Sequence, residues 1–260
     1  MNNSKTCPTS DVRLPPTASC RKKRVRLRRA VLWLAAGVAF ALLLLGDAPL
    51  MRMRYLLVGE QPQGLFKQFV GSAREFGQAM AVIVAACIVA SCDRRRVAIL
   101  LTLVLAEIVS SATGNAGKLT IVRYRPCAAV DALRTGDDTD KPAILAKMRP
   151  GDSWIGWRPW NVHSATQSFP SGHSAAAFVL AVTLAAFYPR LAWLLWTLAV
   201  CCALSRFFDA MHWPSDCWAG SLIGYASAWL ALKAHDALRR RSPPPADATC
   251  GTVLTSAGSG

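Results

Sequence analysis

The stretch SRFFDAMHWPSD, residues 205–216, places an arginine, a histidine and an aspartate between two strongly apolar runs. These runs cover residues 191–204 and 217–234 and are almost free of charged side chains. Polar and ionisable groups beside a membrane-like layer are costly, so they mark candidate functional sites. The chain is therefore organised around polar chemistry at the edge of an apolar layer.

The composition is too apolar for an ordinary soluble domain, because 53% of the 260 residues are hydrophobic and only 17% are charged. A membrane core takes roughly 20 helical residues to cross, fewer where flanking arginines snorkel. Six apolar runs come near this length: residues 30–46, 79–92, 97–112, 174–188, 191–204 and 217–234. We expect an all-α, six-helix transmembrane bundle. A soluble all-helical protein is the rival interpretation, but residues 97–112 and 191–204 lack the polar face that a surface helix needs.

The basic residues lie where the connections of a six-helix membrane chain would lie. The net charge is +15, and seven of the nine residues at 21–29 are basic. Further basic residues stand at 94–96, at Arg190 and at 239–241, which are alternate connections on one side. The positive-inside rule then predicts cytoplasmic termini and an outer location for residues 205–216. A nucleic-acid-binding tail at 21–29 is the alternative, although anionic lipid would also attract it.

The sequence predicts one membrane domain, residues 30–238, between two disordered cytoplasmic tails, residues 1–29 and 239–260. Both tails are polar, and prolines at 243–245 stop any helix. The basic stretch followed by residues 30–46 resembles a signal peptide, but no convincing cleavage site follows. We therefore expect a retained anchor.

Two polar segments are expected on the outer side. Residues 61–78 mix apolar and charged side chains and are predicted to lie along the membrane interface. Residues 127–169 form the longest polar stretch and are predicted to be an outer loop or a small cap. Trp154, Trp157 and Trp160 within it could form an interfacial belt, a substrate wall or a packing cluster.

Glu107 and two cysteines leave alternatives open. Glu107 lies inside an apolar run, where it either has a function or pairs with a hydroxyl or a cation, such as Lys118 eleven residues later on the same helical face. Cys127 and Cys217 are near the outer side, where a disulfide could form. Two small apolar residues are the default interpretation of this pair.

Three polar segments on the predicted outer side carry the candidate chemistry. In the first, Lys118 and Arg125 are seven residues apart and would share one face of a helix that Pro126 ends. A pair of cations on one face suits a phosphate, but such pairs are also common at helix ends.

The second segment is FPSGHS, residues 169–174, at the start of an apolar run. Its glycine allows close backbone approach, and the free N–H groups of a helix start favour an anion. A simple N-cap and turn is the alternative, although His173 is an unusual choice for capping alone.

The third segment is the stretch at 205–216. His212 and Asp216 are four residues apart, so the carboxylate could hold one ring nitrogen while the other nitrogen faces a reacting centre. Arg206 precedes them, and Ser205 could orient it. Asp216 could also cap the last helix.

Together the three segments resemble the signature of the type 2 phosphatidic acid phosphatase family, K-x6-R-P, P-S-G-H and S-R-x5-H-x3-D. All eleven signature residues are present: Lys118, Arg125, Pro126, Pro170, Ser171, Gly172, His173, Ser205, Arg206, His212 and Asp216. The resemblance extends over residues 79–234 and implies a six-helix core of the phosphatidic acid phosphatase and haloperoxidase type.

The resemblance also implies a reaction: a metal-independent phosphatase that forms a phosphohistidine and needs no cofactor. It gives His212 the role of nucleophile, Asp216 that of its orienting group and His173 that of general acid. The phosphate would be bound by Lys118, Arg125, Ser171, Gly172 and Arg206.

Three functions follow from these observations. The first is a lipid phosphate or diphosphate phosphatase of a bacterial inner membrane, with its site on the periplasmic side. Its partners would be the lipid and the bilayer, with no nucleic acid, and its oligomeric state is not predicted. The second is a vanadate-dependent haloperoxidase, and the third is a non-catalytic carrier or scaffold. Phosphatidic acid, phosphatidylglycerol phosphate, undecaprenyl pyrophosphate and lipid A all fit the first.

Overall fold

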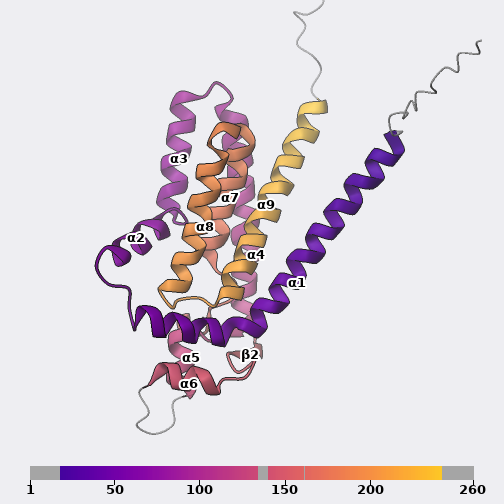
Figure 1. The fold of residues 1–260 in the computed structure, drawn as a ribbon. Helices are drawn as coiled ribbons and strands as arrows, with labels where there is room; N and C mark the ends of the chain where they lie inside the picture. The colour runs from indigo at the N-terminus through magenta and orange to yellow at the C-terminus, as the bar shows by residue number, and fades with distance from the viewer. Residues whose placement is uncertain (1–17, 134–139, 161, 242–260) are drawn as a thin grey trace, which may run out of the picture. The chain divides into compact units, whose positions relative to one another are not determined.

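The structure is a computed structural model that describes residues 18–133, 140–160 and 162–241 (Figure 1). The chain divides into two units, Met1–Leu42 and Leu43–Gly260. Helix α1 (Ala18–Val58) begins in the first unit. Residues 18–29 are therefore helical, whereas the sequence predicted disorder there. Arginine, lysine and alanine favour helices, and the apolar run continues the same helix. Residues 239–241 of the other predicted tail are helical as well. The rest of the predicted tails, residues 1–17 and 242–260, lies outside the described residues.

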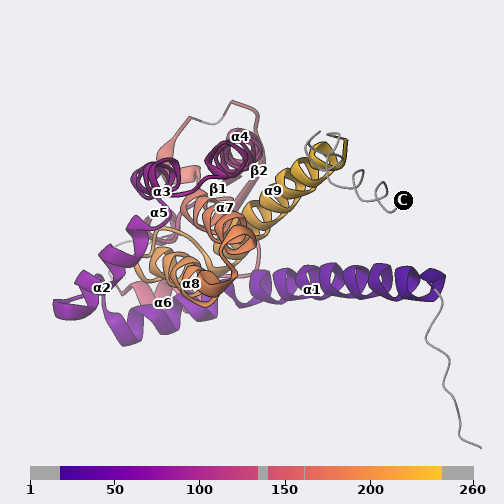
Figure 2. The same ribbon diagram turned by 90° about the horizontal axis from the view of Figure 1, so that it is seen from above.

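Five helices of the second unit lie side by side in both ribbon views (Figures 1 and 2). Helix α7 is central and contacts α4, α8 and α9. The five helices are α3 (Ala79–Cys92), α4 (Arg96–Thr120), α7 (Gly172–Phe187), α8 (Ala192–Phe208) and α9 (Pro214–Arg241). A 3₁₀ turn, η2 (Pro189–Leu191), joins α7 to α8.

Small residues let α9 approach α7 closely. A Cβ at Gly220 would overlap the carbonyl oxygen of Ser171, and one at Gly224 would overlap that of Ala175. Ala177 and Ala181 of α7 have no exposed surface. Small residues permit such backbone approach between membrane helices. The packing fixes the start of α9 against the start of α7.

Helices occupy all six predicted apolar runs, but they differ in their fitness to span a membrane. Three have the required length and hydropathy: Ala30–Val58, Arg96–Thr120 and Pro189–Phe208. Helices α2 (Gly64–Glu75) and α3, which are bent by 58° relative to each other, would together make a fourth span. Helix α7 is apolar but has only 16 residues. The chain is thus a mostly helical membrane protein with three or four candidate spans.

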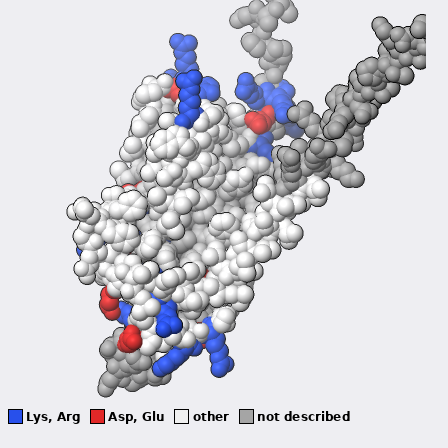
Figure 3. Space-filling view, viewed as in Figure 1, with Lys and Arg blue, Asp and Glu red and all other residues white. Residues whose placement is uncertain are grey.

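The charged side chains leave a broad uncharged band. On the face of the second unit shown in Figure 3, Lys and Arg side chains gather at two ends, with uncharged residues between them. Arg94 and Arg95 lie between α3 and α4, Arg96 begins α4, and Arg239, Arg240 and Arg241 end α9. A band of this kind suits the hydrocarbon layer of a bilayer.

The predicted outer loop is a small folded cap. Its elements are β1 (Ile121–Arg123), α5 (Pro126–Leu133), α6 (Lys141–Lys147), β2 (Trp154–Trp157) and the 3₁₀ turn η1 (Ser164–Thr166). The two strands pair antiparallel. Trp154 packs on Phe169 with ring centroids 5.3 Å apart, whereas Trp157 and Trp160 are exposed. The three tryptophans therefore do not share one packing cluster.

Candidate active site

The three signature segments meet at one end of the helix bundle. The N–H of Ser171 donates to the carbonyl of Asp216 at 3.1 Å, which joins the start of α7 to the start of α9. A Cβ added to Gly172 would lie 3.2 Å from the ammonium nitrogen of Lys118, so the end of α4 reaches the start of α7. A glycine at this position leaves the backbone accessible to an anion.

The first segment has a different local structure from the predicted one. Helix α4 ends at Thr120, β1 follows, and Pro126 begins α5 instead of ending a helix. Lys118 and Arg125 therefore do not share a helical face. The β-branched residues Thr120, Ile121 and Val122 favour a strand, and a residue before proline avoids the helical region. Both cations still act electrostatically on His212.

His212 is held in one tautomer by the backbone. Its Nδ1 lies 2.8 Å from the carbonyl oxygen of Ser168, which can only accept, so Nδ1 carries the proton. The side chain is 3% exposed. Burial and the nearby Arg206 and Arg125 hold the pKa of His212 well below its ordinary value. The ring is therefore neutral, with a free lone pair on Nε2.

Asp216 supports His212 indirectly. Its carboxylate is 4.0 Å from Nδ1, too far for a hydrogen bond, so the expectation that it holds the ring nitrogen is not met. It accepts instead from the hydroxyl of Ser168 at 2.5 Å and from the N–H of Trp213 at 3.0 Å. The carboxylate thereby fixes the residue whose carbonyl orients His212.

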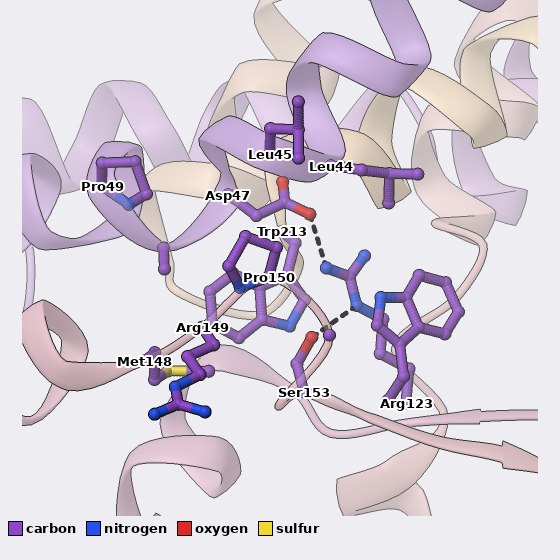
Figure 4. A pocket seen from close by; sticks show the side chains of 13 residues that line it. Leu44, Leu45, Asp47, Pro49, Arg123, Met148, Arg149, Pro150, Ser153 and Trp213 are labelled. Atoms are coloured by element: carbon purple, nitrogen blue, oxygen red, sulfur yellow. Dashed lines mark hydrogen bonds and ion pairs between the residues drawn. The ribbon is translucent and has the colours of Figure 1, made fainter.

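A buried ion-pair network behind Asp216 was not predicted from the sequence. Arg123 donates to Asp216. It also donates, at 2.5 Å, to Asp47 of α1 (Figure 4). Asp47 also accepts from the N–H of Ser215 at 3.0 Å, and Arg123 donates to Ser153 at 3.1 Å. Arg123 occupies one of the unspecified x positions of K-x6-R-P, so the signature does not point to it. The sequence offered one signal for the network, the Asp47 carboxylate at the end of the first apolar run.

Arg206 and Arg125 bring guanidinium groups to the site. Arg206 pairs with Asp209 at 3.1 Å, which gives a role to an acid outside the signature. Ser205 donates to the carbonyl of Cys202 at 2.7 Å and therefore does not orient Arg206. The Nε atoms of Arg125 and Arg206 are buried without a hydrogen-bond partner among the described residues. Such donors are available to an anion.

His173 lies in the first turn of α7, before the apolar run that starts at Ser174. Burial, together with Arg206, Arg74 and Lys118, lowers its pKa to about 4. The side chain is therefore neutral at pH 7 while the site holds no anion. A phosphate among these cations would offset their charge and favour the protonated ring.

Comparison with known proteins identifies the family. A model of the PAP2 superfamily matches residues 95–240, more than half of the chain, and all three segments lie within the match. The chain belongs to the PAP2 superfamily. Asp47 and Arg74 lie outside the matched residues, so the family model does not account for them.

Three curated relatives of this PAP2 protein match shorter stretches. An undecaprenyl-diphosphatase of Sulfolobus acidocaldarius is 28% identical over 51% of this chain and 53% of its own length. The bacitracin transport permease protein BcrC of Bacillus licheniformis is 35% identical over 27% and 37%, respectively. A lipid A 1-phosphatase of Rhizobium johnstonii is 35% identical over 28% and 29%. The chain spans about half the length of the first relative and about a third of the others.

A solved structure is also similar to this PAP2 chain. The first transmembrane PAP2 type phosphatidylglycerolphosphate phosphatase from Bacillus subtilis aligns with a TM-score of 0.48 and 15% identity. The alignment covers 80% of this chain and 98% of that one.

Glu107 lines a pocket with Lys118, Ser171 and Gly172 of the PAP2 signature. Its Oε1 is buried and has no hydrogen-bond partner among the residues that the structure describes. Glu107 and Lys118 thus line the same pocket, as their positions on one helical face predicted. Glu107 therefore lies next to residues that the signature predicts to bind phosphate.

The part of the chain that the structure describes also bears on the predictions for metal ligands and cysteines. Within the described ranges, no three His, Cys, Asp or Glu side chains come together as metal ligands. Cys127 and Cys217 are both free thiols, so the disulfide considered from the sequence is not formed. Cys217 is buried at the start of α9, in keeping with the default interpretation as a small apolar residue.

Proposed function

We propose that this PAP2 protein is a membrane phosphatase that hydrolyses a lipid phosphate or diphosphate through a phosphohistidine. The observation that carries the proposal is the 2.8 Å hydrogen bond from Nδ1 of His212 to the carbonyl of Ser168. It leaves a neutral ring with its Nε2 lone pair directed away from that bond. A nucleophilic histidine needs this state.

The first step forms a bond between Nε2 of His212 and phosphorus. The bond between phosphorus and the leaving oxygen breaks, and His173 gives that oxygen its proton. In the second step a water molecule attacks the phosphohistidine, His173 takes a proton from the water, and the N–P bond breaks to release inorganic phosphate. His173 thus acts first as an acid and then as a base.

Cations and backbone donors stabilise the charge on the transferring group. Lys118, Arg125 and Arg206 would bind the equatorial oxygens, and the buried Nε donors of the two arginines support this role. The hydroxyl of Ser171 and the N–H of Gly172 add neutral donors. Removal of one such donor typically costs about 2.7–4 kcal/mol of barrier, or about 10²–10³ in rate.

The membrane arrangement that we propose has six spans. Helices α7 and α9 would add two spans to the four candidates, which are Ala30–Val58 of α1, the α2–α3 pair, α4 and α8. The helix bundle of Figure 1 would then cross the bilayer with the site at one end. Positive residues at 94–96, 190 and 239–241 support cytoplasmic termini. The site would then face the periplasm of a bacterial inner membrane.

A lipid is the substrate class that this location supports. The apolar tail would stay in the bilayer while the phosphate enters the basic site. The names of two relatives, an undecaprenyl-diphosphatase and a lipid A 1-phosphatase, support a phosphorylated lipid.

The test is a phosphate-release screen with purified protein in detergent and a chelator present. The substrates are phosphatidic acid, phosphatidylglycerol phosphate, undecaprenyl pyrophosphate and lipid A. We expect release from at least one of them and none above background with His212→Ala. An unchanged rate in this variant would exclude His212 as the nucleophile. Transport of the lipid without release of phosphate would favour a carrier, and halide oxidation that appears only with vanadate would favour a haloperoxidase.

A further inference from the structure

Arg74 is a third guanidinium with an available buried donor. Like Arg125 and Arg206, it has a buried Nε without a hydrogen-bond partner among the described residues. The other two belong to the signature, whereas Arg74 lies in the last turn of α2 and outside the residues that match the family. An unpaired guanidinium donor in a basic site is available for an anionic ligand.

The backbone places Arg74 beside His173. The sulfur of Cys202 lies 3.6 Å from the carbonyl oxygen of Arg74 and 3.7 Å from that of His173. The turn after α2 packs here so closely that a Cβ on Gly77 would overlap the carbonyl oxygen of His173 and come within 2.6 Å of this sulfur. The end of α2 and the start of α7 therefore share one contact point. Arg74 also acts electrostatically on His173 and Arg206.

Neighbouring side chains hold only one end of the Arg74 guanidinium. Its Nη2 pairs with Glu75 at 3.1 Å, and Gln78 donates to the same carboxylate oxygen at 2.7 Å. The Arg74 side chain is 42% exposed, so a ligand in the site could reach it. The guanidinium is thus paired at Nη2, while its Nε is buried and has no hydrogen-bond partner among the described residues.

We propose that Arg74 binds the second phosphate of a lipid diphosphate, so that the preferred substrate is a diphosphate. This inference rests on the proposed function, in which His173 protonates the leaving oxygen. When His212 attacks the terminal phosphorus of a diphosphate, the bond to the bridging oxygen breaks and a lipid monophosphate leaves. This leaving group remains anionic after protonation, whereas the alcohol that leaves a monophosphate is neutral. A cation beside His173 therefore contributes more to departure from a diphosphate than to departure from a monophosphate.

The experiment compares a polyprenyl diphosphate with the same polyprenyl monophosphate in detergent. We expect Arg74→Gln to lower kcat/KM for the diphosphate roughly 10- to 100-fold and to change the value for the monophosphate less than about threefold. Arg74→Lys, which keeps the charge but lacks Nε, should lose an intermediate amount. Lys67→Gln is the matched control, because Lys67 is an exposed cation on the same helix. It should change neither substrate.

Inorganic pyrophosphate supplies a second readout without a lipid. It should inhibit the wild type more strongly than Arg74→Gln, whereas inorganic phosphate should inhibit both equally. Equal losses for the two lipids, or no loss for either, would overturn the role of Arg74. Failure of the proposed function has a different signature, since folded wild-type protein would then release no phosphate from either lipid.

Discussion

At the residue scale, the proposed reaction places different requirements on two histidines of one basic site. As the proposed nucleophile, His212 must be neutral, and both its burial and its bond to Ser168 favour that state. As the proposed acid, His173 must be protonated, yet burial and the nearby cations lower its pKa to about 4. The proton can arrive with the substrate, because a phosphate monoester loses its second proton near pH 6.

This arrangement predicts the pH dependence for a soluble phosphate monoester. Below about pH 4, His173 of the free protein is itself protonated, so protein and monoanionic substrate together hold one proton too many and kcat/KM should not rise further. Between about pH 4 and about pH 6, neutral protein and monoanionic substrate together hold the required proton, so kcat/KM should be level. Above about pH 6 the substrate loses that proton, and kcat/KM should fall about tenfold per pH unit. Steady-state rates over pH 4–8 check this prediction. As a control for irreversible inactivation, samples held at each pH should regain full activity when returned to pH 6. A level profile up to pH 8 would contradict it.

At the element scale, periodicity and length predicted the helices better than the connections. Residues 79–92 form a helix with the predicted bounds. The prediction that one helix carries both Lys118 and Arg125 was wrong, because seven-residue spacing alone cannot distinguish two helical turns from a short strand. The β-branched run before Pro126 was the local signal for the strand. Ser171 and Gly172 were correctly expected at a helix start, where Ser171 is the N-cap.

The contact between α7 and α9 leads to a prediction for Gly220. Gly220→Ala places a Cβ on the carbonyl oxygen of Ser171, so α9 must move away from α7. We expect a loss of about 1–3 kcal/mol of stability, typical of overpacking, and a loss of phosphate release. Thermal unfolding and phosphate release in detergent measure the two effects. Gly71→Ala is the matched control, since no heavy atom lies within 4 Å of its added Cβ. A similar loss in both variants would show that the contact is not the cause.

At the scale of the whole molecule, the signature predicted the residues that we propose bind the phosphate, but not those that pack behind them. Asp47 and Arg123 are 76 residues apart, and no spacing rule relates the end of one apolar run to a strand. Arg74 was likewise one cation among many in the sequence. Their relation to His212 and His173 follows only from tertiary packing. The sequence therefore named the candidates for phosphate binding, and the fold was needed to find the residues that pack behind them.

The charge at the two ends of the molecule predicts its orientation. Cys92 is exposed at the end of α3, next to Arg94–Arg96, whereas Asp152 is exposed in the cap near β2. The positive-inside rule places Cys92 in the cytoplasm and the cap, with the active site, outside. In bacterial cells that express single-cysteine proteins, a membrane-impermeant maleimide should label Asp152→Cys in intact spheroplasts. It should label a variant that keeps only Cys92 after permeabilisation alone. The reverse pattern would put the phosphate site on the cytoplasmic face, and the lipid would then have to be supplied from that leaflet.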